Sequence, residues 1–145
     1  MNFKTEKDFL SKHEKSDDVS NTKQMVTSPH LNKLKEEYSN IPEDYLFYLS
    51  EIGAGSIREC QFKVQSYLFD FKDIDLDDIY NIKEGIKFFG DNFSGDFAGF
   101  DLSKNNDEVI EFWHDSEQFY YTKMTFREYI REKMLMDING NDLKQ

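Results

Sequence analysis

The chain has 145 residues, 16% of them aromatic, which argues against general disorder and suffices for one domain with a buried core. Its 29 acidic and 18 basic residues give a formal net charge of −11, which disfavours direct binding to nucleic acid or to a membrane and favours a basic protein partner. It contains one cysteine, lacks an apolar run of the roughly 20 residues that span a bilayer, and begins without a signal-peptide pattern, so we expect a reduced, soluble, cytoplasmic protein.

The chain begins with a variable N-terminal segment, residues 1–25, that is polar and weakly patterned. Phe3 and Leu10 fit one face of a short helix, whereas residues 16–23 are typical of a loop. The first clear helix signal follows at Ser28 and Pro29, since Ser caps free amides and Pro suits the first helical position. The helix stripe that follows consists of Leu31, Leu34 and Tyr38.

A second helix is predicted from Pro42. Glu43 and Asp44 lie in its first turn, where negative charge favours the positive end of the helix dipole. Its apolar stripe consists of Tyr45, Leu46, Leu49 and Ile52. Gly53-Ala54-Gly55 ends the helix, because Gly readily takes the left-handed conformation at a helix C-terminus.

From Ile57 onward the apolar period shortens to two residues, which predicts strands. Cys60 alternates with Phe62 and Val64, so we expect a buried thiol on the apolar face of a strand. The acidic stretch 71–81 is either a loop or a short helix. The predicted strands are 57–64, 67–69, 86–89, 97–102, 109–113 and 119–121.

Thr125 and Glu128 form the capping-box pattern of a closing helix, and a polar tail follows over residues 137–145. Helices, then a run of strands, then a helix predict an α+β fold. We expect a mostly antiparallel sheet of about five or six strands, packed with N- and C-terminal helices. We interpret residues 1–145 as a single domain whose core covers about 28–131.

The charge is concentrated in one stretch. Residues 70–117 contain 14 acidic and 4 basic residues, net −10. Such a stretch is either a solvated face or a docking surface that speeds the encounter with a cationic partner.

Two features of the sequence resemble a metal site or a catalytic site, but simpler interpretations fit them better. Residues 73–84 have oxygen side chains at several EF-hand positions, but Asp78 stands where the loop needs Gly, so an acidic loop is favoured. His114 beside Asp115 is a weak acid–base candidate and fits the end of a strand better. We therefore expect no catalytic residue, no metal site and no cofactor.

Three blocks occur in an order that resembles the SUKH superfamily, which includes fungal cell-wall-synthesis regulators and many bacterial immunity proteins. The first block is 41–49 leading into 52–55, the second is 88–91 with 94–101, and the third is 109–114 with a closing 125–130. The resemblance covers roughly residues 28–131. One departure is Ile41-Pro42, where the family usually has Leu-Pro.

The resemblance implies a non-enzymatic antitoxin that binds and neutralises a cognate toxin. The expected partner is a basic protein toxin, with a nuclease domain as the leading candidate, because nucleases need basic surfaces to hold phosphates. The alternative is an intracellular scaffold or regulatory module without a toxin, and the oligomeric state stays open. The expected partner-binding residues are Asp75, Asp77, Asp78, Tyr80, Asp91, Asp96, Asp115 and Glu117.

Overall fold

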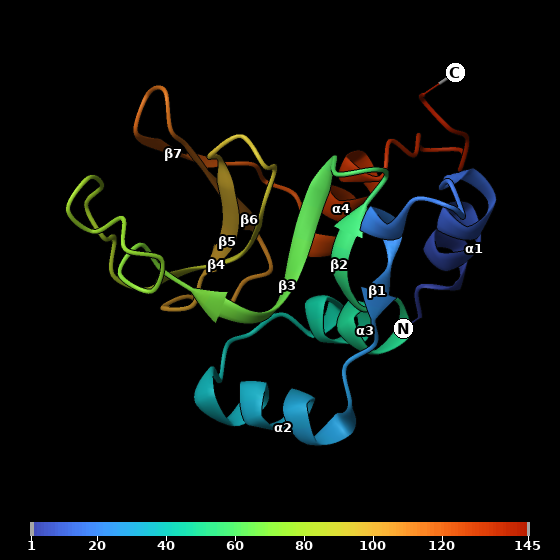
Figure 1. Cartoon of the computed structure of the whole chain (residues 1–145). Helices are drawn as coiled ribbons and strands as arrows, with labels where there is room; N and C mark the ends of the chain where they lie inside the picture. Colours follow the sequence, from blue (N-terminus) through green and yellow to red (C-terminus); the bar gives the residue numbers. More distant parts are fainter. Residues whose placement is uncertain (1, 145) are drawn as a thin grey trace.

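The computed structural model describes residues 2–144 and confirms an α+β fold (Figure 1). Within that range, no helix is both long and apolar enough to cross a membrane. The helices there are α1 (Lys4–His13), α2 (Ser28–Glu37), α3 (Glu43–Glu51) and α4 (Phe126–Lys133), with a short 3-10 helix η1 (Val19–Asn21).

One seven-stranded antiparallel sheet runs through the described residues, and its strands lie in the order of the chain. This is one or two strands more than expected, because the first two are short and lack apolar alternation. The strands are β1 (Lys23–Gln24), β2 (Ala54–Ile57), β3 (Phe62–Phe69), β4 (Ile86–Asp91), β5 (Phe97–Asp101), β6 (Val109–Trp113) and β7 (Gln118–Tyr121).

The strand predicted over 57–64 is wrong, because the chain reverses direction between Ile57 and Phe62, which pair with each other. Arg58, Glu59 and Cys60 have left-handed φ values of 48°, 53° and 70°, as a tight turn requires. Cys60 is exposed in this turn, so the prediction of a buried thiol is also wrong. Apolar alternation indicates which side chains share a face, but it does not reveal a break in strand pairing.

The first core lies between the sheet and helices α1 to α4, and it is rich in aromatic rings. Tyr45 of α3 contacts Phe89, Phe100 and Phe126, with ring centroids 5.8, 5.8 and 5.5 Å away. The pairs with Phe100 and Phe126 are edge-to-face, a geometry that adds to the stability that burial of the rings provides. This core fixes the helices on one face of the sheet.

The second core lies on the other face of the sheet, where no long helix is needed, because loop 70–85 between β3 and β4 covers it. Phe71 at the start of the loop packs on Phe88 and Phe112, at centroid distances of 5.1 and 4.8 Å. The loop also contributes Ile74, Leu76 and Tyr80. Residues 71–81, for which the sequence allowed either a loop or a short helix, therefore form a series of turns. The side chains that face the sheet from these turns are apolar.

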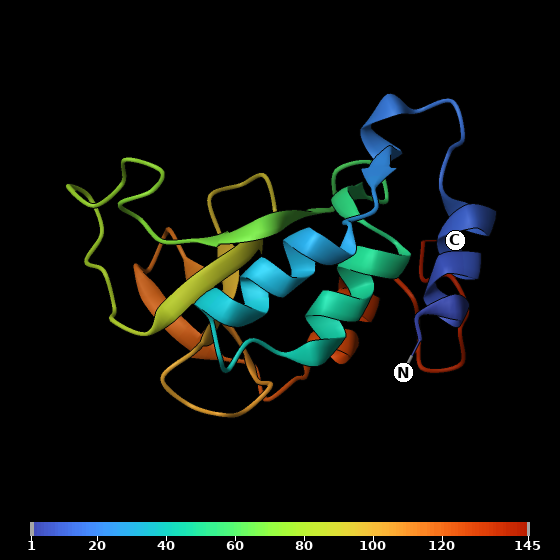
Figure 2. The ribbon, with the colours of Figure 1, turned by 90° about the horizontal axis from the view of Figure 1, so that it is seen from below.

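Both ends of the chain are tied to the domain at the side away from loop 70–85 (Figure 2). Asp142 in the tail accepts two hydrogen bonds from the buried Arg58 guanidinium, at 3.0 and 3.1 Å, and lies 3.4 Å from the His13 ring. The N-terminal segment, which showed little pattern, therefore contains an ordered helix that packs beside the tail.

Candidate partner-binding surface

Residues 70–117, the acidic stretch of the sequence, form the half of the molecule away from α1 and the termini (Figures 1 and 2). We call this part the acidic half. It consists of loop 70–85, strands β4 to β6 and the turns that join them. The excess negative charge of this stretch is therefore concentrated on one half of the molecule, so the electric field of the molecule is directional.

Loop 70–85 presents most of its carboxylates to solvent. Its side chains Ile74, Leu76 and Tyr80 pack against the sheet, whereas Ile79 and Ile82 are exposed. Asp75, Asp77 and Asp78 are exposed, in agreement with a solvent-facing acidic loop. Tyr80 is half-buried, with its ring 5.2 Å from Phe71 and 4.8 Å from that of Phe112. Tyr80 therefore anchors the loop to the sheet, and only part of its surface is free for a partner.

A groove of about 340 Å³ lies next to Tyr80, between loop 70–85 and the β6–β7 hairpin. Tyr80 and Glu117 both line it, so the fold brings together two of the expected binding residues that are far apart in sequence. The floor of the groove is aromatic, since Phe112 and Phe119 also line it. Lys83 lines the groove as well, and its ammonium lies 5.5 Å from the Phe119 ring centroid, so a cation of the chain itself already lies over this aromatic floor.

The tips of the β4–β5 and β6–β7 hairpins are joined by Asp96. Its carboxylate accepts hydrogen bonds from the His114 backbone N–H at 3.0 Å and lies 2.7 Å from His114 Nδ1. Burial acts to raise the pKa of Asp96, but the bonds from His114 and from Asn92 outweigh it and lower the pKa below its ordinary value. Asp96 is therefore charged at neutral pH and shapes the surface as well as contributing charge.

The remaining expected residues lie in the same two turns. The carboxylate of Asp91 accepts a hydrogen bond from the Phe93 backbone N–H at 3.0 Å, so it also supports the β4–β5 turn. Asp115 is exposed at the tip of the β6–β7 hairpin, next to Glu117. The eight expected residues thus fall into two neighbouring groups, the outer face of loop 70–85 and the hairpin tips.

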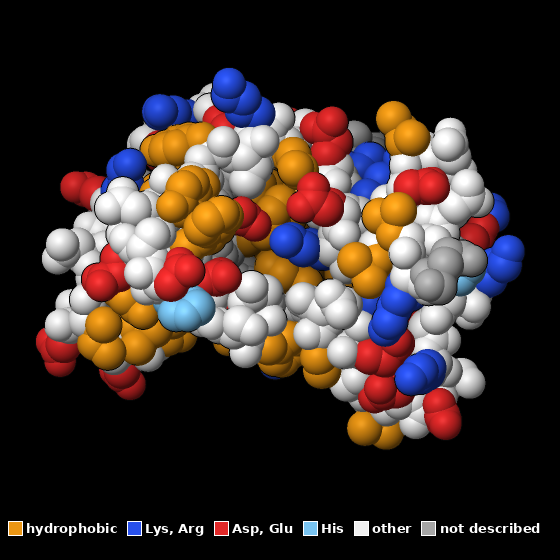
Figure 3. Space-filling view, turned by 90° about the horizontal axis from the view of Figure 1, so that it is seen from above, with side chains coloured by type: hydrophobic (Ala, Val, Ile, Leu, Met, Phe, Trp, Pro, Cys, Tyr) orange, Lys and Arg blue, Asp and Glu red, His pale blue; other side chains and the backbone are white. Residues whose placement is uncertain are grey.

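A pair of aromatic rings beside these tips, one exposed and one half-buried, was not singled out from the sequence. Trp113 of β6 and Tyr120 of β7 lie on the same side of the sheet as α4, and their ring centroids are 4.0 Å apart. Trp113 is 40% exposed. We call these two residues the aromatic ledge. Figure 3 shows the molecule from above, where hydrophobic side chains and carboxylates stand side by side over the acidic half.

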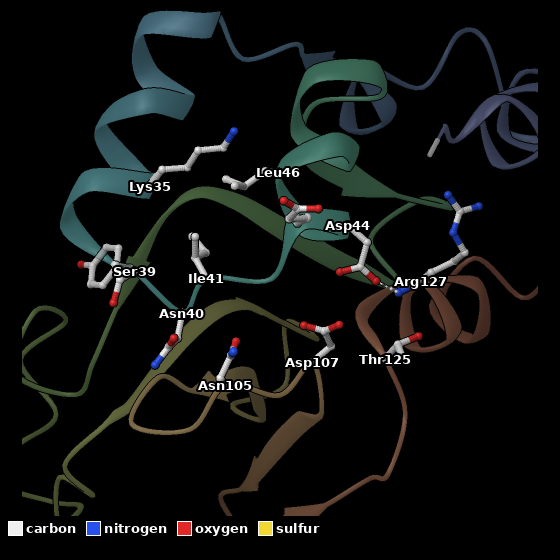
Figure 4. Close-up of a pocket in the computed structure, with 12 residues that line it drawn as sticks. Lys35, Ser39, Asn40, Ile41, Asp44, Leu46, Asn105, Asp107, Thr125 and Arg127 are labelled. Carbon is white, nitrogen blue, oxygen red and sulfur yellow. Dashed lines mark hydrogen bonds between the residues drawn. The ribbon is translucent and has the colours of Figure 1, made fainter.

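A larger groove, of about 630 Å³, lies between the α2–α3 connection, the β5–β6 loop and the start of α4 (Figure 4). The carboxylates of Asp44 and Asp107 point into it from opposite sides, while the Arg127 guanidinium points away. The three segments that form this groove are distant in sequence, so no local pattern could have revealed it.

Asp44 has a structural role at the edge of that groove. Its carboxylate accepts a hydrogen bond from the Arg127 backbone N–H at 3.1 Å, which caps the first turn of α4 from a neighbouring helix. Burial, followed by the negative charge of Asp107, raises the pKa of Asp44 above its ordinary value in spite of this bond. The groove therefore disfavours additional negative charge.

The weak alternatives for metal and acid–base chemistry find little support in the geometry. Loop 70–85 is preceded by strand β3 and followed by strand β4, whereas an EF-hand loop is flanked by helices. From Asn2 to Lys144, no group of three or more His, Cys, Asp or Glu side chains is arranged to hold a metal ion. His114 pairs with Asp96 rather than with Asp115, which corrects the pairing considered from the sequence.

Comparison with known families matches residues 25–132 to the SMI1 / KNR4 family (SUKH-1). The match includes strands β2 to β7, the acidic half and all of helix α4 except its last residue. Comparisons with curated proteins and with solved structures give no significant match. Since the family match extends over most of the chain, the protein belongs to the SMI1 / KNR4 family (SUKH-1).

Proposed function

We propose that this chain is a bacterial immunity protein that acts in the cytoplasm, where it binds a cognate toxin and neutralises it without catalysing a reaction. The observation that carries the proposal is that a SUKH-1 domain concentrates its acidic stretch on one half of the molecule. A surface of this kind attracts a basic protein over a distance and speeds the formation of the complex.

The toxin that suits this surface is a basic nuclease domain. A nuclease must attract phosphate groups, so its substrate-binding face carries excess Lys and Arg. An acidic inhibitor is complementary to that same face. We propose direct contact through loop 70–85 and the hairpin tips, with the expected acids as charge contacts.

The direct test is protection of living cells. A basic toxin domain that co-purifies with the chain from its native cells is expressed in a heterologous host, with and without the chain, and surviving colonies are counted. Protection is expected, together with a complex that withstands purification at low salt. A chain that expresses and folds but gives no protection against that toxin contradicts the proposal and favours a scaffold or regulatory role.

A stoichiometric titration separates binding from catalysis. The purified toxin is titrated with the chain, and the residual toxin activity is measured. Because each molecule of a binding inhibitor occupies one toxin molecule, toxin activity should fall linearly and reach its minimum near one equivalent of the chain. Inactivation of many toxin molecules by one molecule of the chain would instead indicate an enzyme.

A further inference from the structure

The aromatic ledge is rigid before any partner arrives. The Trp113 indole N–H donates a hydrogen bond to Glu111 at 3.1 Å, and the other carboxylate oxygen of Glu111 accepts one from the Tyr129 hydroxyl at 2.6 Å. The Tyr120 hydroxyl lies 3.1 Å from the Ser116 hydroxyl. The exposed Trp113 ring and the half-buried Tyr120 ring are therefore both held by hydrogen-bond partners, so little conformational entropy would be lost on binding.

The rings of the ledge are not covered by any described cation of the chain, unlike several other aromatic rings of the molecule. Several rings already have one of the chain's own cations over them: Arg127 lies over Phe3, Arg58 over Phe9, Lys133 over Tyr129, and Lys83 over Phe119 and Tyr121. Within residues 2–144, no Lys or Arg lies over Trp113 or Tyr120. Trp113 belongs to the residue type that binds a cation best; it is 40% exposed and has no described Lys or Arg over its ring.

The surroundings of the ledge are negative. Asp96 binds the backbone of His114, the residue after Trp113, and Asp115 and Glu117 belong to the hairpin that joins the two ring-bearing strands. Burial and then the hydrogen bond to Glu111 raise the pKa of Tyr129 above its ordinary value, and the charges of Glu111, Glu132 and Asp96 add to this effect. Lys133, 3.7 Å from Glu111, is the cation paired at the base of the ledge.

We propose that the aromatic ledge of Trp113 and Tyr120 is the anchor point of the toxin interface and binds an arginine side chain of the basic partner. This inference rests on the proposed function and names the residues that carry it. A planar guanidinium can stack on the indole while its N–H groups reach the carboxylates at the rim. The surrounding acidic residues then set the association rate, and the ledge supplies most of the binding free energy.

The ledge can be tested without the toxin, because Trp113 is the only tryptophan of the chain. The full chain is titrated with the peptide Arg-Gly-Arg-Gly-Arg at low salt, and tryptophan fluorescence is recorded. A saturable change is expected, and Tyr120→Ala should weaken the apparent affinity by at least about fivefold because half of the ledge is lost. A peptide with Gln in place of Arg should give no saturable change.

Tyr67→Ala is the matched control, since Tyr67 is another exposed tyrosine but lies near Phe69 on the sheet face that loop 70–85 covers. This variant should bind the peptide as the unmodified chain does. The absence of a saturable signal, an equal response to the Gln peptide, or an equal loss with Tyr67→Ala overturns the inference. Thermal melts confirm that each variant is folded, and Tyr120→Leu replaces Tyr120→Ala if the latter is not.

A second measurement with the toxin separates this inference from the proposed function. Trp113→Ala should raise the Kd for the toxin by about 30-fold, as expected for a central aromatic anchor. Tyr67→Ala should leave the Kd within about twofold of that of the unmodified chain. An unchanged Kd with Trp113→Ala overturns the ledge as anchor and leaves the immunity function intact. Failure of the unmodified chain to protect cells overturns the function, and the peptide titration still decides whether the ledge binds arginine.

Discussion

Glu6 is a charged residue in the most protected part of the molecule, and it joins α1 to α4. Its side chain is fully buried and accepts hydrogen bonds from Arg127 at 2.8 Å and Arg131 at 2.7 Å. Glu6→Gln should lower the free energy of unfolding by about 2–4 kcal/mol, because two guanidinium groups lose their counter-charge in a site with little water. Asp8→Asn on the same helix is the control.

Asp8 forms only an exposed pair with Lys4, so its replacement should change the free energy of unfolding by less than about 0.5 kcal/mol. Urea denaturation of the three proteins measures both effects. Equal losses for Glu6→Gln and Asp8→Asn would show that helix α1, rather than the buried charge, determines the stability difference.

Through Asp142, the stability of the folded state depends on pH. Its hydrogen bond from Arg58 lowers the pKa of Asp142 below the ordinary value of 3.8. An acid whose pKa is lower in the folded state stabilises that state above the ordinary pKa, and the stabilisation is lost as the pH falls through the lowered value. The cost of Asp142→Asn should therefore be about 1–3 kcal/mol at neutral pH, and it should shrink as the pH falls below the ordinary pKa and through the lowered one.

Denaturation of the unmodified chain and of Asp142→Asn, repeated from neutral to acidic pH, checks this expectation. Asp17→Asn serves as the control, because Asp17 is exposed and its replacement should give the same small difference at every pH. A cost for Asp142→Asn that does not vary with pH would mean that the tail is held by packing rather than by this ion pair.

Among the elements, loop 70–85 has an unexpected structural role, since it covers one face of the sheet in place of a helix. Phe71 is 1% exposed and lies at the centre of the second core. Phe71→Ala should cost about 3–4 kcal/mol of the free energy of unfolding and raise hydrogen exchange throughout the loop. Ile79→Ala, which removes a 63% exposed side chain from the same loop, should change neither quantity appreciably. If exchange in the loop stays slow in Phe71→Ala, another contact holds the loop on the sheet.

The sequence predicted best those elements whose signals are local. Helix α4 is an example, because the Thr125 hydroxyl accepts from the Glu128 N–H at 3.3 Å and the Glu128 carboxylate accepts from the Thr125 N–H at 3.0 Å. A capping box lies within four residues and needs no knowledge of the rest of the fold. The apolar run of β6 was equally clear, and β6 does lie inside the sheet between β5 and β7.

The sequence alone could not predict features that depend on strand register or on contacts between residues far apart in the chain. The aromatic ledge exists because Glu111 pairs with Tyr120 across β6 and β7, which places Tyr120 diagonally beside Trp113. A shift of one residue in that register would turn one ring to the other face of the sheet. The pairing of His114 with Asp96 likewise joins two hairpins, so the sequence offered only its chain neighbour Asp115 as a partner.

At the scale of the whole molecule, the position of the charge matters in addition to its sum. The double variant Asp115→Asn, Glu117→Gln removes two exposed charges from the acidic half, and Asp17→Asn, Glu36→Gln removes two exposed charges from the other half. Both variants have the same net charge. At low salt the first should slow association with the toxin by about two- to tenfold more than the second, since nearby opposite charges guide the encounter.

The two variants should converge as salt is added, because screening at about 1 M ionic strength confines charge effects to about 3 Å. Dissociation should change much less than association in either variant, because rim charges act mainly on the encounter. Stopped-flow measurements over a range of salt concentrations test both statements. Equal slowing by the two variants would mean that net charge alone attracts the toxin, and the binding face would then have to be sought by shape, starting with the aromatic ledge and the groove beside Asp44.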